Sequence, residues 1–271
     1  MILDGLFIYP VKGLRGIAVR EAVVEPWGLQ GDRRWMVVDS GGRYLTQRDL
    51  PGMARIVAVP DAGGIALSAE GMAPLHVPLP RLPVEVLVWR DRVRAQEAGP
   101  DAAAWLSRAL GHPCRLVHMG DPAAARGVDP AYARAEDRVS FADGFPVLVV
   151  NAASLDDLNA RMAQPVPMDR FRTNLVVSGA PAWAEDGWRM LDVGPVRFRG
   201  PKTCARCVVI TTDQATGVRP RDREPLRTLT GFRRDDGGRV IFGMNLIPDN
   251  EGRISVGMEV LDDRTTITTD H

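Results

Sequence analysis

Two cysteines three residues apart, Cys204 and Cys207, are the side chains of this sequence best suited to chemistry. Such a pair occurs in zinc sites, in dithiol redox centres and where one thiolate binds a heavy metal. Zinc needs four ligands, and neither Cys114 nor any of the four histidines has paired spacing. A redox dithiol needs a helix after the first cysteine, whereas residues 208–212 predict a strand. A single thiolate ligand and two buried small residues therefore both stay open.

Arginine and asparagine stand directly before two apolar segments. Arg33 precedes the strand predicted at residues 35–38, and a solvated strand start explains it simply. Arg172 and Asn174 precede the apolar segment 175–178, and two-residue alternation places both on one face of an extended chain. A guanidinium and an amide on one face suit a phosphate or a planar heterocycle.

Only two of the 34 basic residues are lysines, Lys12 and Lys202. A coding bias toward arginine explains why lysine is rare, but not why Lys202 lies two residues before Cys204. An ammonium and a guanidinium are not interchangeable where a site binds a specific group. Both lysines are therefore candidate site residues.

A loop before a buried segment carries Asp143 and Gly144. The carboxylate could accept hydrogen bonds from ring N–H groups, and Gly144 could expose backbone amides, although a simple turn is the more frequent case. His112 and His118 flank a predicted strand, where histidine packs more often than it ligates. We find no catalytic triad order, phosphate loop or dinucleotide fingerprint.

Composition limits the possible partners. The chain has 271 residues, 45% of them hydrophobic, and 34 basic against 34 acidic residues, so its formal net charge is zero. This balance argues against nucleic acid and anionic membranes as partners, and any bound anion needs a local basic cluster. No apolar run of about 18 residues predicts a membrane span, and the N-terminus lacks secretory features. With three cysteines, we expect a cytoplasmic location.

The segment before residue 95 predicts short strands separated by turn residues, and therefore a small barrel or sandwich. A hairpin is expected at Gly41-Gly42. The predicted strands cover residues 3–9, 16–24, 35–38, 56–59 and 84–89.

The rest of the chain mixes both patterns. We expect a helix over 101–110 capped by Asp101, and a second one opened by Ser154 with Asp157 in the capping-box position. A loop is expected over 120–137 and a frayed tail over 264–271. Further strands are predicted at 145–150, 175–178, 193–199, 208–212, 240–245 and 254–261. The chain is thus mainly β with flanking helices (α+β), with an N-terminal domain at 1–95 and a second domain at 96–271.

Several segments together resemble one family, the MOSC proteins. Residues 6–17, 31–39 and 45–48 look like the MOSC N-terminal β-barrel domain, and residues 171–177, 183–188, 202–213 and 224–229 look like the MOSC β-barrel domain. The resemblance covers nearly the whole chain, and its motifs are specific in combination. It is strongest to the amidoxime-reducing members, mitochondrial and bacterial.

This resemblance implies a molybdenum cofactor, molybdenum bound to molybdopterin. By position, Cys207 matches the catalytic residue that ligates the metal. The cofactor-binding positions that match are Lys12, Gly13, Arg33, Asp143, Gly144, Arg172 and Asn174. Two residues depart from the pattern: Gly13 replaces a usual serine, and Phe145 replaces a small polar residue.

The implied activity is an oxidoreductase that reduces small N-hydroxylated, amidoxime-like compounds or related N- or S-oxides. Because no cysteine follows Cys207, no iron–sulfur domain is expected, and electrons must come from a separate flavin, heme or iron–sulfur protein. An alternative is a sulfur-carrier or cofactor-delivery module in which Cys207 carries a persulfide. A degenerate member that binds little is a third interpretation.

Overall fold

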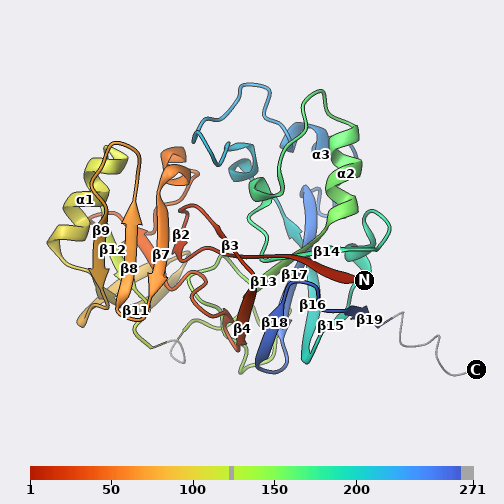
Figure 1. The fold of residues 1–271 in the computed structure, drawn as a ribbon, viewed down its shortest axis with the longest axis horizontal. Helices are drawn as coiled ribbons and strands as arrows, with labels where there is room; N and C mark the ends of the chain where they lie inside the picture. Colours follow the sequence, from red (N-terminus) through yellow and green to blue (C-terminus); the bar gives the residue numbers. More distant parts are fainter. Residues whose placement is uncertain (122–124, 264–271) are drawn as a thin grey trace, which may run out of the picture.

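A computed structural model describes residues 1–121 and 125–263 and confirms a mainly β fold with flanking helices (Figure 1). The predicted tail at 264–271 and part of the predicted loop, 122–124, lie outside the described residues. An eight-stranded sheet dominates the half drawn in green to blue. Its order is β19 (Val260–Asp262), β15 (Met190–Val193), β16 (Val196–Ala205), β17 (Ile241–Pro248), β13 (Val147–Asn151), β14 (Leu175–Ser178), β1 (Ile2–Ile8) and β3 (Ile17–Val19).

Three smaller sheets complete the β structure. The five-stranded sheet has the order β10 (Leu82–Val88), β11 (Asp91–Glu97), β12 (Arg115–His118), β6 (Trp35–Val38) and β2 (Val11–Lys12). One three-stranded sheet joins β7 (Val57–Asp61), β8 (Gly64–Ser68) and β9 (Leu75–Pro78). The other joins β18 (Gly252–Ser255), β4 (Glu21–Glu25) and β5 (Gly28–Leu29).

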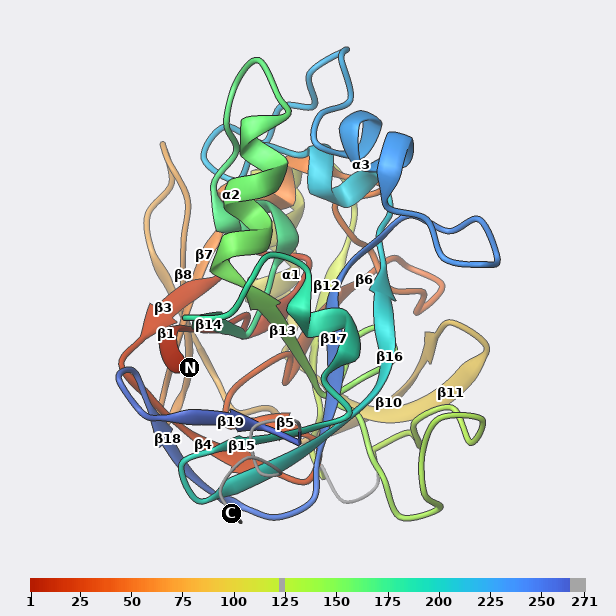
Figure 2. The ribbon, with the colours of Figure 1, turned by 90° about the vertical axis from the view of Figure 1, so that its right-hand side faces the viewer.

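The first strands of the chain belong to the sheets of its last third. Strand β1 pairs antiparallel with β14, with Leu6 opposite Leu175. Strand β4 pairs antiparallel with β18, with Val23 opposite Arg253. Figures 1 and 2 show these red N-terminal strands beside green and blue ones. The two halves are therefore joined by backbone hydrogen bonds as well as side chains, and the domain boundary at residue 95 stays a prediction.

Two apolar cores correspond to the two halves. Leu3 and Leu6 of β1 are fully buried in one core together with Trp188 and Phe198. The other core packs the sheets of the first hundred residues against the apolar face of α1 (Pro100–Leu110), including Trp105. Burial of such large side chains contributes about 1.5–3 kcal/mol each.

The predicted helices form, but their caps differ from expectation. The N-cap of α1 is Gly99, so Asp101 lies in the first turn and not at the cap. Helix α2 (Ala152–Ala160) is capped by Asn151, whose side chain accepts from the backbone N–H of Ala153. Ser154 donates instead to Glu185, at 2.7 Å. Asp157 is not part of a capping box, because Arg161 and Trp183 bind its carboxylate. A short third helix, α3 (Leu226–Phe232), follows later.

Four predicted strands need correction. The expected strand 16–24 is two strands, β3 and β4, which belong to different sheets. The expected strand 193–199 is a hairpin of β15 and β16, because Gly194 turns the chain with a φ of 53°. The expected strand 254–261 is split into β18 and β19, with Gly257 between them at a φ of 93°. Residues 208–212 are not a strand: Val208–Thr211 forms one 3-10 turn, η5. Packing of Ile210 in a core with Phe171 overrides the β propensity of this segment.

The predicted hairpin at Gly41-Gly42 is present as a tight connection. Val38 and Tyr44 form an isolated antiparallel bridge, and the N–H of Leu45 donates to the carbonyl of Val37 at 2.8 Å. Residues 125–137 contain no helix or strand, as expected for a loop.

His118 packs against Trp35, with 4.6 Å between ring centroids, and its Nδ1 has no hydrogen-bond partner. Burial, and then the charge of Arg34, lowers the pKa of His118 to about 4. In the unfolded chain a histidine titrates near a pKa of about 6.5. Between these values the unfolded state binds a proton that the folded state excludes.

The free energy of unfolding should therefore fall as the pH falls from about 6.5 towards 4, by at most about 1.4 kcal/mol per pH unit from this residue. His118→Phe keeps a ring on Trp35 and should reduce that slope in urea unfolding measured at several pH values. The exposed His112, changed to glutamine, is the control and should keep it. An unchanged slope in His118→Phe would contradict the assignment.

Candidate functional site

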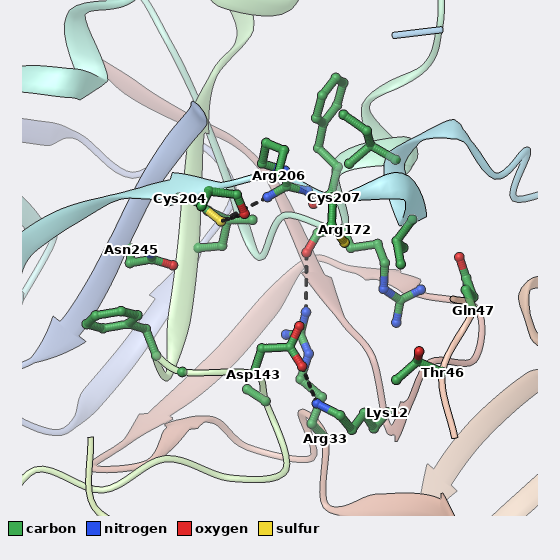
Figure 3. Close-up of a pocket in the computed structure, with 18 of the residues that line it drawn as sticks. Lys12, Arg33, Thr46, Gln47, Asp143, Arg172, Cys204, Arg206, Cys207 and Asn245 are labelled. Carbon is green, nitrogen blue, oxygen red and sulfur yellow. Dashed lines mark hydrogen bonds and ion pairs between the residues drawn. The ribbon is translucent and has the colours of Figure 1, made fainter. Parts of the chain in front are cut away.

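A cavity of about 400 Å³ lies where the two halves meet, and the candidate residues line it (Figure 3). Its walls come from the segments after β2, β6 and β16, from the loop before β13 and from the turn before β14. The lining residues include Lys12, Gly13, Arg33, Thr46, Gln47, Arg48, Asp143, Gly144, Phe145, Phe171, Arg172, Asn174, Lys202, Cys204, Arg206, Cys207 and Asn245. All eight residues predicted for the site, far apart in sequence, are thus brought to one cavity.

Cys207 lies just past the end of β16, in extended backbone at the N-cap of η5. Both cysteines of the pair are only half-buried, so the interpretation as buried small residues is wrong. Arg206 positions this turn: it donates to the carbonyl of Phe171 at 2.6 Å and to the Cys204 sulfur at 3.0 Å. Figure 3 shows the sulfur of Cys207 on the cavity side, near Arg172.

Two further guanidiniums lie beside the Cys207 sulfur. Burial lowers the pKa of Arg48, but Asp143 and Cys207 outweigh burial and raise it. Burial also lowers the pKa of Arg219, and Cys207 opposes that shift. Arg219 donates to Thr212 at 3.1 Å and to the carbonyl of Arg48 at 3.2 Å, while its buried Nη2 has no partner. The thiol therefore lies in a strongly positive environment.

The cavity wall is positively charged, although the chain as a whole has a formal net charge of zero. The charged side chains of the wall are six cations, among them both lysines of the chain, and one carboxylate, that of Asp143. Low-dielectric walls concentrate the potential of such a group of like charges. The cavity is thus the local basic cluster that an anion would need.

Asp143 is the one counter-charge in the wall, and its side chain is 58% exposed. Its carboxylate pairs with the buried Lys12 and, at 3.4 Å, with Arg48. Partial desolvation in the cavity wall raises the pKa of Asp143, but Lys12, Arg48 and Arg33 outweigh this effect and hold that pKa far below the usual range. Burial lowers the pKa of Lys12, and the negative charge of Asp143 opposes this decrease. The carboxylate therefore stays ionised, as a hydrogen-bond acceptor facing the cavity.

Tyr9 supports two arginines of the site. The guanidinium carbons of Arg33 and Arg172 lie 4.5 and 4.3 Å from its ring centroid. Burial raises the pKa of the Tyr9 hydroxyl to about 12, and this hydroxyl donates to the carbonyl of Thr173 at 3.1 Å. Gly16 makes room for the ring, because a Cβ there would come within 2.4 Å of it.

Two-residue alternation predicted an extended chain at Arg172, and this prediction is wrong. Arg172 ends a 3-10 turn, η3 (Met168–Phe171), with a φ of 53°. Burial, followed by the repulsion of Arg33, lowers the pKa of Arg172 to about 10, although Tyr9 and Asp32 oppose this. Burial and a neighbouring cation disfavour the charged form of this guanidinium, and a bound anion would stabilise that charged form.

Asn174 is buried and uses all its hydrogen-bonding capacity on protein groups. Its Oδ1 accepts from Arg33 at 3.1 Å and from the N–H of Leu148 at 3.2 Å, and its Nδ2 donates to Asp32 and to the carbonyl of Phe7, both at 3.1 Å. Asp32 binds Arg33 at 2.6 Å and is itself fully buried. The solvated strand start proposed for residues 32–34 is therefore wrong, and Asn174 orients Arg33.

The two glycines differ in their surroundings. Gly13 has a φ of 84°, a left-handed conformation that a side chain would strain, and a Cβ there would lie 2.8 Å from the flexible end of Met53. Its carbonyl accepts from Gln47 at 2.9 Å. A Cβ on Gly144 would meet nothing within 4 Å, so its backbone borders open space.

Site residues not proposed from the sequence include Arg48, Arg206, Arg219 and Asn245. Arg48 belongs to a segment that carries the family resemblance, and Arg206 stands inside the Cys-x-x-Cys pair; each was a signal that could have been used. Arg219 and Asn245 have no local signal, because only their tertiary position brings them to the site.

Comparison with known proteins agrees with this architecture. The MOSC N-terminal beta barrel domain matches residues 1–113, and the MOSC domain matches residues 136–261. The chain therefore belongs to the MOSC family.

Two kinds of relative match most of the chain. It is 34% identical over 271 residues to mitochondrial amidoxime-reducing component 1 of Mus musculus, with 93% of this chain and 79% of the relative covered. The Homo sapiens protein of that name is 34% identical over 272 residues, with 93% and 80% covered. The molybdenum cofactor sulfurase of Oryza sativa subsp. japonica is 31% identical over 268 residues, covering 90% of this chain but 32% of the sulfurase.

Asn174→Ala should lower the free energy of unfolding by about 2–4 kcal/mol, because the buried Asp32, Arg33 and Leu148 N–H each lose a partner. Urea unfolding measures this. Asn245→Ala is the matched control: it lines the same cavity but makes one long hydrogen bond, 3.4 Å to Thr203, and should cost less than about 1 kcal/mol. Equal losses would contradict the role of Asn174.

Proposed function

We propose that this chain is a molybdenum-cofactor-dependent reductase of N-hydroxylated small molecules, with Cys207 as the metal ligand. The observation that carries the proposal is the Cys207 thiol in the wall of a cavity lined by six cations. The matched relatives support it, because one group is named for amidoxime reduction and the other for the molybdenum cofactor.

The side chains present fit a large anionic group that brings most of its own metal ligands. No cluster of three or more His, Cys, Asp or Glu that could hold a bare metal ion occurs in residues 1–121 and 125–263. One soft thiol suits a heavy metal already ligated by sulfur. The lowered pKa of Arg172 and the unpaired Nη2 of Arg219 both favour added negative charge.

The chain's own residues would have separate roles. Lys12, Arg33 and Arg172 would hold the anionic part, since Asp32 and Asn174 already fix Arg33 in place. Asp143 would accept from ring N–H groups, and Gly13 and Gly144 would contribute backbone contacts. Arg48, beside Cys207, would stabilise the thiolate as a ligand. When bound, the cofactor supplies two-electron redox chemistry at the metal.

Electrons would come from a separate flavin, heme or iron–sulfur protein. None of the helices in the described part of the chain is long and apolar enough to cross a membrane. The cytoplasmic location stays a prediction.

A second candidate, a sulfur-carrier or cofactor-delivery role for Cys207 as a persulfide, is favoured by the sulfurase relatives. The chain spans about a third of their length, 31–32% of each. The same half-buried thiol would serve, so the two functions differ in what is bound to its sulfur.

Purified protein should carry close to one molybdenum per chain, and Cys207→Ser should lose both the metal and the reduction of benzamidoxime, because it removes the proposed ligand. Elemental analysis and an assay with a chemical reductant measure these. Cys114→Ser is the matched control, since Cys114 is buried in the other core. Equal molybdenum in wild type and Cys207→Ser would sink the reductase proposal. A mass increase of one sulfur atom without molybdenum would favour the sulfur carrier.

Arg172→Gln should weaken cofactor retention about tenfold, the size of one charge-assisted hydrogen bond. Molybdenum content after dialysis at rising salt measures it. Arg253→Gln removes the same charge from an exposed ion pair with Glu21 and should retain wild-type content. If both variants retain metal equally at every salt concentration, Arg172 is no cofactor contact.

A further inference from the structure

A second lobe adjoins the cavity, and most of its wall is formed by residues outside the proposed cofactor contacts. This lobe, of about 510 Å³, shares Trp89, Asp143, Gly144, Phe145 and Lys202 with the first cavity. The loop at residues 126–132 forms its far wall. The two hollows therefore adjoin at these five shared residues and form the two ends of the site.

The two ends differ in chemistry. In Figure 3, Lys12, Thr46 and Gln47 lie on one side of the labelled site, and Asn245 lies on the other. Lys202 stands opposite Asn245 in the pairing of β16 and β17. The first end is therefore basic and polar, and Lys202 belongs to the second.

Aromatic rings line the second lobe. Tyr132 and Phe145 meet edge to face, with 6.1 Å between ring centroids. Trp89 is 51% exposed, with Arg48 5.1 Å from its ring centroid. A flat ring can pack against such surfaces, because aromatic pairs favour edge-to-face and offset-stacked contacts.

Lys202 is the free cation of this lobe. Its Nζ lies 4.0 Å from the ring centroid of Tyr132, and in the described ranges its side chain has no ion pair or hydrogen bond. Three carboxylates line the lobe: Asp91 pairs with Arg126, Asp143 pairs with Lys12, and Asp129 accepts from the backbone N–H of Ala131 at 3.0 Å. Within residues 1–121 and 125–263 none of them pairs with Lys202, so its ammonium is available to an anionic ligand.

We propose that this lobe binds the ring of an aromatic, carboxylate-bearing substrate, with Lys202 pairing with the carboxylate. The inference rests on the proposed reductase function, and it narrows the substrate class to anionic aryl N-hydroxy compounds. Phe145, which departs from the family pattern, supplies one of the stacking surfaces of the lobe. The reacting N–OH group would then point past the shared wall residues toward Cys207, which lines the first cavity.

The test compares benzamidoxime with 4-carboxybenzamidoxime. We expect wild type to prefer the carboxylated compound in kcat/KM, and Lys202→Gln to lower that preference about tenfold, the size of one charge-assisted hydrogen bond. Lys202→Arg should keep most of it, and Arg253→Gln, remote from the cavity, should keep all of it. Rates are normalised to molybdenum content.

Binding is measured separately by calorimetric titration of each compound, 4-carboxybenzamidoxime or benzamidoxime, into the purified protein without reductant. Lys202→Gln should raise the Kd about tenfold, with a weaker salt dependence. Tyr132→Leu, on the other wall of the lobe, should raise the Kd of both compounds.

Each outcome decides one question. If wild type reduces benzamidoxime but neither the preference nor the Kd changes in Lys202→Gln, the inference is wrong and the proposed function stands. If wild type reduces neither compound yet the Kd depends on Lys202, the proposed function fails and the lobe assignment stands. If Lys202→Gln loses molybdenum while the normalised preference is unchanged, Lys202 belongs to the cofactor site and the inference is overturned.

Discussion

Positive charge held in a half-buried cavity is the constraint on which the rest of this structure depends. Like charges repel strongly where water is partly excluded, so each cation needs a partner. Asp32 neutralises Arg33, and Asp143 neutralises Lys12, but no carboxylate among residues 1–121 and 125–263 binds Arg172. The folded chain therefore maintains a positive potential beside the Cys207 thiol, which an anionic ligand would relieve.

The pairing of β1 with β14 holds this charge in place. The Lys12 ammonium donates to the carbonyl of Phe141 at 2.8 Å, and the side-chain amide of Asn174 donates to the backbone carbonyl of Phe7 at 3.1 Å. These contacts join residues more than a hundred positions apart, across the junction of the two halves. The cavity can form only when both halves have folded against each other, so site and fold depend on the same contacts.

The two departures from the family pattern have physical explanations. Gly13 has a left-handed backbone and lies close to Met53, so a side chain there would be strained and the carbonyl carries the contact to Gln47. Phe145 packs against Tyr132 at the mouth of the second lobe. The glycine at position 13 thus changes the backbone at the basic end of the site, and the phenylalanine at position 145 adds a ring to the aromatic lobe.

Local sequence pattern was sufficient to predict the mainly β class, strands such as Trp35–Val38 and Leu175–Ser178, and the two longest helices. Alternation and helical periodicity extend over only a few residues, so they can be recognised without knowledge of tertiary contacts. The family motifs brought Lys12, Arg33, Asp143, Arg172 and Cys207 together as candidates. The helix caps, the 3-10 turn after Cys207 and the conformation of Arg172 could not be read this way, nor could the contributions of Arg219 and Asn245. Those features come from contacts between distant segments, and such packing overrides the local preferences that a sequence pattern records.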